Sequence, residues 1–139
     1  MNRILAPILL LVFLFPALAL SEEVVDWDDL VEREGIYYKK FTDVPFTGKT
    51  TGQIQGSFKD GKEEGPSVFY FDDGQLWGKG DFKNGEMEGP WVEYNDNGQL
   101  LYEGNYKNGR REGPWVVYNS DGTVWEEHTG TYKNDVKVD

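Results

Sequence analysis

Residues 80–100 read GDFKNGEMEGPWVEYNDNGQL, and this pattern recurs along the chain. Its opening part joins a glycine, an aromatic residue, a lysine and an Asn-Gly or Asp-Gly pair. That part begins at Gly56, Gly80 and Gly104, at intervals of 24 residues, and a further copy begins at Gly130. A unit of this size cannot bury an apolar face by itself, so the period predicts a stacked array of repeats.

Each unit is predicted to be a β-hairpin, because an Asn-Gly or Asp-Gly pair between aromatic-rich runs favours a two-residue turn. The other turn is interpreted as a three-residue loop, 96–98, with Gly98 left-handed, which pairs Tyr94 with Leu100. Strand side chains alternate between the faces of a sheet, so this register predicts which face is the core. The predicted core face carries Val92, Tyr94, Leu100, Tyr102, Gly104 and Tyr106, with Val68, Tyr70, Leu76, Phe82, Val116, Tyr118, Val124 and Tyr132 in the other units.

Two further expectations concern packing within the array. Gly80 and Gly104 are expected to leave room for a neighbouring ring to lie flat over the backbone. Lysines that enter the turns and glutamates that leave them are expected to face each other across each hairpin, as exposed pairs worth under ~1 kcal/mol. These residues are Lys59, Lys83, Lys107, Glu64, Glu88 and Glu112.

The composition excludes several classes of protein. With 139 residues the chain makes one modest domain, and with no cysteine and one histidine it lacks disulfides, thiol catalysis and the usual zinc sites. A net charge of -11 argues against nucleic acid or an anionic membrane as partner. His128 lies in a loop insertion without an orienting partner, and a calcium loop with Gly98 at its sixth position would need its glutamate where Gly104 stands. No catalytic, cofactor or metal site is therefore predicted, and the protein is not expected to be an enzyme.

The N-terminal residues predict export. Arg3, an apolar run over 4–14 and the small residues before Ala19 are typical of a secretory signal peptide, and the run is short of the ~20 residues that cross a bilayer. The protein is therefore expected to be periplasmic or secreted. The predicted organisation is a signal peptide at 1–19, a non-repeat segment at 20–51 with a degenerate first repeat from 46, and the array at 52–139.

The non-repeat segment is expected to contain one short helix. Residues 26–35 are interpreted as one or two helical turns with Asp28 as the cap and Gly35 as the stop. A strand is predicted to follow at 36–40.

The motif that is complete from Gly80 to Leu100 resembles the bacterial MORN-type (membrane occupation and recognition nexus) repeat. More narrowly it resembles the YwqK family, described as antitoxins of toxin–antitoxin systems. The resemblance covers Phe46 to Lys133 and implies an all-β, elongated antiparallel β-meander of hairpin repeats. It also implies a non-enzymatic protein that binds another protein or, in some eukaryotic relatives, a lipid. Ser67 departs from the motif, and a signal peptide would place an antitoxin outside the cytoplasm.

The second face of the predicted sheet carries the candidate binding residues, in which tryptophans alternate with polar side chains. Two interpretations are open: the rings cover the back of the sheet, or they form a binding strip. A strip would suit a basic protein, with the carboxylates steering its approach, or a cell-wall glycan stacked on the rings. A structural envelope protein and a lipid-surface binder are further alternatives. The candidate residues are Trp77, Trp91, Glu93, Glu103, Trp115 and Trp125.

Overall fold

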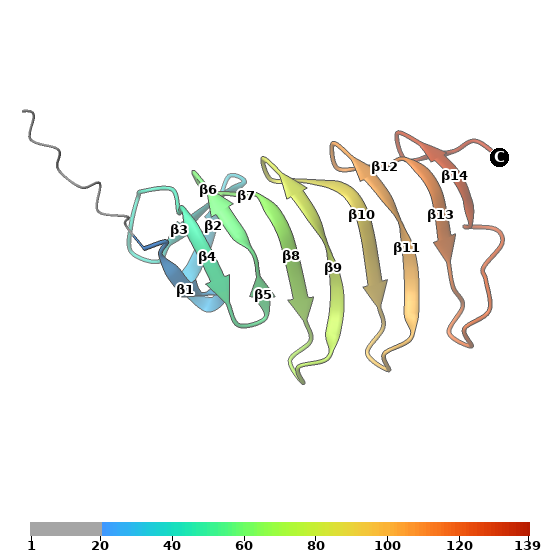
Figure 1. The fold of residues 1–139 in the computed structure, drawn as a ribbon, viewed down its shortest axis with the longest axis horizontal. Coiled ribbons are helices and arrows are strands. Elements are labelled where there is room, and N and C mark those ends of the chain that lie inside the picture. Colours follow the sequence, from blue (N-terminus) through green and yellow to red (C-terminus); the bar gives the residue numbers. More distant parts are fainter. Residues whose placement is uncertain (1–20) are drawn as a thin grey trace, which may run out of the picture.

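The computed structural model describes residues 21–139, which fold into an all-β protein (Figure 1). The predicted signal peptide at 1–19 lies outside the described residues. Successive hairpins stand side by side along the long axis of the molecule, and their connections alternate between its two edges (Figure 1). The prediction of an elongated antiparallel β-meander is confirmed.

The described strands form three sheets. The largest has nine strands in the order β15-β14-β13-β11-β10-β9-β8-β5, with β12 beside β11; the others are β1-β4-β6-β7 and β2-β3. Neighbours are antiparallel apart from the parallel pair β1 and β4. The elements are β1 (Val24–Asp26), the 3-10 helix η1 (Trp27–Asp29), β2 (Leu30–Arg33), β3 (Ile36–Lys39), β4 (Gly48–Thr51), β5 (Ile54–Gln55), β6 (Ser57–Lys59), β7 (Lys62–Glu63), β8 (Gly65–Tyr70), β9 (Leu76–Lys83), β10 (Glu86–Tyr94), β11 (Leu100–Lys107), β12 (Arg110–Arg111), β13 (Gly113–Val117), β14 (Gly130–Lys133) and β15 (Val136–Lys137).

The Asn-Gly and Asp-Gly pairs form the predicted two-residue turns. Asn84 and Gly85 have φ angles of 53° and 81°, so both central residues are left-handed, as a type I′ turn requires. Asp135 replaces the glycine in the last turn and keeps the same geometry, with φ at 69°. Asn and Asp tolerate this region better than other side chains, which is why the sequence varies here without losing the turn.

A β-bulge at the other end of two hairpins reverses the predicted alternation of faces. Tyr94 pairs with Leu100, and Gly98 is left-handed with φ at 81°, both as predicted. Glu93, however, pairs with Tyr102, so Leu101 is an extra residue on its strand. Since side chains alternate, one extra residue moves everything after it to the opposite face. The predicted core face is therefore wrong, because it combined Val92 with residues that lie on the other side of the sheet.

The observed core of the array is a row of rings, here called the aromatic cluster. Trp91, Trp115 and Tyr132 are buried, and Phe69, Phe82, Met87, Tyr102 and Tyr106 pack against them. The rings alternate edge to face: the centroids of Trp91 and Tyr106 are 6.1 Å apart at 87°, and those of Tyr106 and Trp115 are 5.0 Å apart at 81°. Aromatic pairs favour this geometry, so one layer of rings shields itself from water.

The glycines within the strands make this burial possible. A Cβ placed on Gly80 would overlap the ring of Trp91, and one placed on Gly104 would overlap the ring of Trp115. The expectation that these glycines leave room for a neighbouring ring is therefore confirmed. The ring lies flat on the neighbouring strand, which supplies the cover that a second layer would otherwise provide.

Consecutive repeats are joined through their type I′ turns. The carboxylate of Glu64 accepts a hydrogen bond from the backbone N–H of Asn84 at 2.8 Å, and Glu88 does the same for Asn108 at 2.8 Å. The backbone adds a second bond, from the N–H of Gly109 to the carbonyl of Met87 at 2.9 Å. The predicted lysine–glutamate pairs are wrong: none of the ion pairs described between residues 21 and 139 joins them. An N–H that points at the carboxylate binds it at lower entropic cost than a mobile lysine can.

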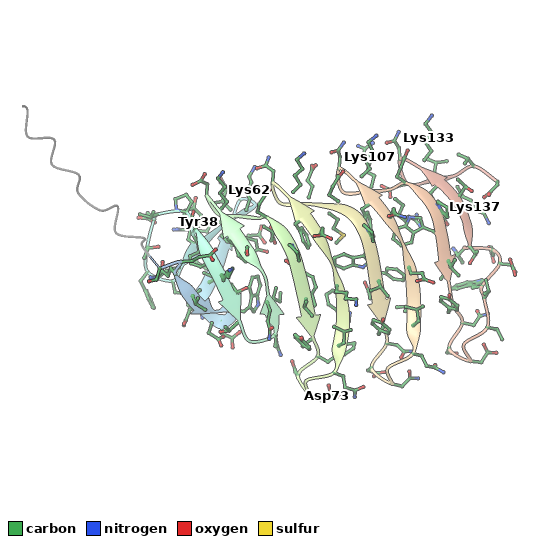
Figure 2. All side chains as sticks on the ribbon, in the orientation of Figure 1. Tyr38, Lys62, Asp73, Lys107, Lys133 and Lys137 are labelled. Atoms are coloured by element: carbon green, nitrogen blue, oxygen red, sulfur yellow. The ribbon has the colours of Figure 1, made fainter. Side chains whose placement is uncertain are left out.

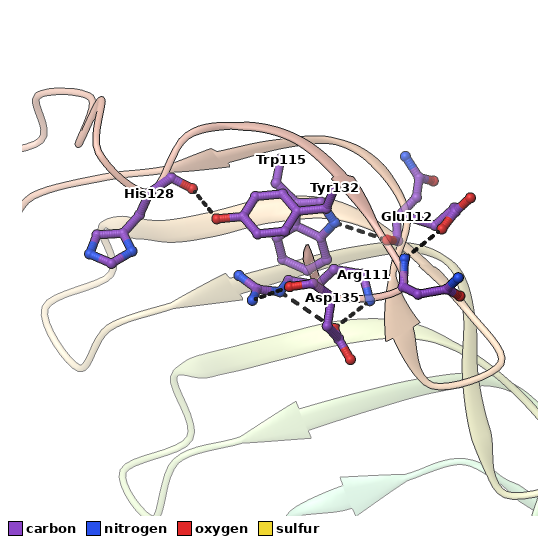
Figure 3. A network of polar contacts seen from close by, with 8 residues as sticks. Arg111, Glu112, Trp115, His128, Tyr132 and Asp135 are labelled. Atoms are coloured by element: carbon purple, nitrogen blue, oxygen red, sulfur yellow. Dashed lines mark hydrogen bonds and ion pairs between the residues drawn. The ribbon is translucent and has the colours of Figure 1, made fainter. Parts of the chain in front are cut away.

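The last repeat is held by the same contacts with one substitution (Figure 3). Glu112 accepts from the N–H of Asn134 at 3.0 Å, and the carboxylate of Asp135 accepts from the N–H of Arg111 at 2.8 Å. The guanidinium of Arg111 lies 4.1 Å from the centre of the Tyr132 ring and pairs with Asp135 at 3.6 Å. Asp135 replaces the glycine of the other turns, and its contacts with Arg111 connect the last turn to the preceding repeat.

The N-terminal segment forms a hairpin where a helix was expected. Only Trp27–Asp29 is helical, as a single 3-10 turn capped by Asp26, and β2 and β3 follow. Glu34 and Gly35 have φ angles of 54° and 75°, so this pair is another left-handed turn instead of a helix stop. The strand predicted at 36–40 is confirmed by β3. The division into a segment at 20–51 and an array at 52–139 stays a prediction.

Candidate functional site

Two of the four tryptophans considered for an exposed strip are part of the core. Trp91 and Trp115 are only 4% and 2% exposed, so the strip interpretation does not hold for them. The bulges are the reason, because they bring these rings to the same face as Tyr102 and Tyr106. Of the two interpretations, these two rings fit the first: they cover the sheet.

Glu93 is half-buried beside the same core and is not a fully exposed steering charge. Its carboxylate accepts a hydrogen bond from the hydroxyl of Tyr102, and the indole Nε1 of Trp91 lies 3.5 Å from the same oxygen. Burial, followed by the hydrogen bond to and the charge of Glu93, raises the pKa of Tyr102. The carboxylate therefore satisfies polar atoms of the aromatic cluster.

The other three candidates are dispersed. Trp77 is partly buried and packs edge-on against Phe69, with ring centroids 5.3 Å apart. Glu103 is exposed on the opposite face of the sheet and accepts from the hydroxyl of Tyr118 at 3.1 Å. Trp125 is 42% exposed and lies 4.0 Å from the ring of His128 in the C-terminal loop. The six predicted residues thus form no single strip.

A different candidate surface lies on the opposite face of the sheet, where a groove of about 610 Å³ runs across three repeats. Its apolar members recur every 24 residues: the valines are half-buried and the prolines are exposed. We call this surface the valine–proline face. It consists of Pro66, Val68, Pro90, Val92, Pro114 and Val116, with Lys79, Asp81, Glu103 and Asn105 between them.

Cross-strand pairing sets the order of side chains on this face. Lys79 pairs with both Val68 and Val92, and Glu103 pairs with both Val92 and Val116. Directly paired side chains on one face are neighbours, so a line across the strands meets valine, lysine, valine, glutamate and valine in turn. A ligand on this line meets apolar contacts at regular intervals, with one positive and one negative charge between them.

The signal for this face was present in the sequence. Val68, Val92 and Val116 share the 24-residue period of the tryptophans, and so do the prolines. The predicted register placed these valines in the core, which left no reason to consider them as a surface. Knowing the position of the bulge would have corrected the assignment.

The part of the chain that the structure describes has neither a metal-binding cluster nor a membrane-spanning helix. No three His, Cys, Asp or Glu side chains in residues 21–139 are grouped so that they could hold a metal ion. In that same part of the chain, no helix has the length and apolar character needed to cross a bilayer. The residues that line the groove include lysine, aspartate, glutamate, asparagine and one serine, Ser67, but no histidine or cysteine.

Comparison with known proteins agrees with the repeat. Residues 63–84 and 87–108 match the family model described as the MORN repeat variant, and residues 79–90 match the MORN repeat. These matches support a MORN-type repeat protein, and they do not extend to the narrower YwqK resemblance. Comparison with curated proteins gave no significant match.

Proposed function

We propose that this MORN-type repeat protein is an exported, non-enzymatic module that binds a segment of another protein on its valine–proline face. The groove on that face carries the proposal. Its valines are half-buried and recur across three repeats, and within residues 21–139 no second layer of strands lies over them. A row of apolar side chains that no other layer covers favours an interaction site.

The spacing of the valines suits an extended peptide that crosses the strands. Val68, Val92 and Val116 lie two strands apart, or about 9.6 Å, because neighbouring strands are ~4.8 Å apart. A polyproline II chain advances about 9.3 Å in three residues. A partner with an apolar residue at every third position would therefore contact each valine in turn. An acidic residue near Lys79 and a basic one near Glu103 would set its direction.

A protein partner is better supported than the alternatives. A glycan needs exposed flat rings, and two of the four tryptophans that were to supply them are buried. An anionic lipid surface would be repelled by a net charge of -11. The signal peptide motif at 1–19 supports export, and the resemblance to the YwqK family favours an immunity-like or antitoxin-like form of protein binding outside the cytoplasm.

A pull-down tests the proposal. The chain from residue 20 is immobilised and exposed to envelope extract, and the protein that it retains is identified. Val92→Glu places a charge at the centre of the groove, and we expect it to weaken binding of the retained protein at least tenfold. Val136→Glu is the matched control, because Val136 is 63% exposed and lies outside the groove. This control should bind as the unchanged protein does.

Overlapping peptides from the retained protein then locate the segment. The segment should show apolar residues at every third position, and exchanging its acidic and basic residues should weaken binding. Equal binding of the partner by the Val92→Glu and Val136→Glu variants would show that the groove is not the binding site.

A further inference from the structure

A second hollow, of about 440 Å³, lies at the edge of the sheet opposite the type I′ turns, where β8 passes into β9. Figure 2 shows Asp73 at this edge and Lys62, Lys107 and Lys133 along the other. The hollow is lined by Tyr70, Phe71, Asp72, Asp73, Trp77 and Asp96. Asp96 comes from the loop of the next repeat, so two adjacent hairpin ends build one site.

The lining combines two features that both attract positive charge. The faces of aromatic rings are electronegative and hold cations within about 6 Å, and carboxylates attract them directly. Gln53 donates to Asp72, and the backbone N–H of Gln75 donates to Asp73 at 2.9 Å. None of the ion pairs described within residues 21–139 uses Asp72, Asp73 or Asp96. Their negative charge is therefore not neutralised by a basic side chain.

The next repeat shows that the fold does not need these side chains. Asn95, Asn97 and Leu101 stand where the first loop has Phe71, Asp73 and Trp77. The backbone bond that closes the loop is nevertheless the same, with N to O distances of 2.8 Å from Phe71 to Gln75 and 2.9 Å from Asn95 to Gln99. Asp73 and Asn97 each accept a hydrogen bond from the backbone N–H two residues later, so the turn needs that oxygen. The rings of Phe71 and Trp77 and the charge of Asp73 are additional to what the turn requires.

We propose that this hollow binds the guanidinium group of an arginine side chain on the protein partner. A guanidinium is planar, stacks on aromatic faces and pairs with carboxylates through two parallel hydrogen bonds, whereas an ammonium is a compact, strongly hydrated charge. The hollow offers the rings and the carboxylates together. This inference rests on the proposed function only for the source of the arginine.

The test uses arginine amide as the probe and NMR of the tryptophan indole N–H groups as the readout. Arginine amide should shift the Trp77 signal in a saturable manner and leave that of the exposed Trp125 unchanged. Lysine amide and choline should bind at least threefold more weakly. A calcium chloride titration serves as a further arm. Equal binding of all three organic cations, a response at Trp125 alone, or a stronger response to calcium would overturn the proposal.

The repeats themselves supply conservative variants. Phe71→Asn and Asp73→Asn install the residues of the next loop, so both should fold and both should weaken arginine amide binding, the pair together by at least tenfold. Asp96→Asn alters the hollow from the neighbouring loop and should weaken binding about threefold. Asp121→Asn is the control, because it changes the charge of a more distant loop at the same edge and should have no effect. Unchanged affinity in the three hollow variants would contradict the proposal.

The two proposals fail separately. The Val92→Glu variant should keep its affinity for arginine amide, because Val92 is not part of the hollow. If the hollow binds arginine while the groove variant retains the partner normally, the proposed function is wrong and the arginine site stands. If the groove binds the partner and arginine amide does not shift Trp77, the arginine site is wrong.

Discussion

At Gly104 the absence of a side chain is a packing requirement, not a conformational one. Its φ is not in the left-handed region, so alanine could adopt the same backbone. The Cβ of an alanine at this position would, however, overlap the ring of Trp115. The indole Nε1 of Trp115 also donates to the carbonyl of Asn105 at 2.9 Å, which fixes the ring in place. The glycine and the tryptophan therefore act as one unit.

A double-mutant cycle tests this unit. Gly104→Ala should lower the free energy of unfolding by about 1–3 kcal/mol through overpacking. Trp115→Ala should lower it by about 3–5 kcal/mol through the cavity it leaves. The double variant should be more stable than the sum predicts, because the added methyl then has space. Urea denaturation measures all four proteins, and strict additivity would contradict the proposed contact.

At the scale of the element, each hairpin depends on the repeat before it. The type I′ turn leaves a backbone N–H at Asn108 directed away from its own hairpin, and the Glu88 carboxylate accepts it at 2.8 Å. The same arrangement recurs at Glu64 and Glu112. A charge-assisted bond to a backbone N–H is stronger than a surface ion pair, which explains why the glutamates bind the turns and not the lysines.

Glu88→Ala should therefore lower the free energy of unfolding by about 1 kcal/mol, since it leaves this N–H to water alone. Glu88→Gln should recover most of the loss, because its amide oxygen also accepts. Glu86→Ala is the matched control two residues earlier and should change stability by less than about 0.5 kcal/mol. Chemical denaturation compares the three. An equal loss at positions 86 and 88 would mean that charge, and not the hydrogen bond, matters.

In the molecule as a whole, the buried apolar residues form two small, separate cores. Leu30, Phe46 and Phe58 form the N-terminal core, against which Tyr37 packs, and the aromatic cluster forms the other. Each core has a half-buried tyrosine, Tyr37 or Tyr102, beside a glutamate. Burial, followed by the charges of Glu63 and Glu32, raises the pKa of Tyr37 to about 12. Stability should therefore depend on pH in the alkaline range.

The direction of that dependence follows from proton linkage. An unfolded tyrosine loses its proton near pH 10.0, whereas folded Tyr37 keeps it until about 12. In that interval the folded state binds more protons, so the free energy of unfolding falls as the pH rises. Tyr37→Phe removes this contribution, and its curve should be flatter above pH 10. Chemical denaturation at pH 8 and at several pH values above 10 measures the free energy of unfolding of both proteins. Parallel curves would contradict the assignment of this pH dependence to Tyr37.

The sequence alone determined what depends on residues close together in the chain. The 24-residue period, the left-handed Asn-Gly turns, the loop that pairs Tyr94 with Leu100 and the glycines under rings all follow from local geometry. Each needs only the residues within one hairpin or the next, so a pattern in the sequence predicts it.

Which face is buried depends on how the strands pair in the folded sheet. Leu101 lies outside the ladder because of how β10 and β11 pair, and nothing in the sequence of either strand alone marks it as the extra residue. That one residue sets which face of β10 lies on the same side as Tyr102 and Tyr106, so Trp91 lies in the core and Val92 on the opposite face. Burial is a property of paired strands, so the candidate binding face emerged only when the pairing was known.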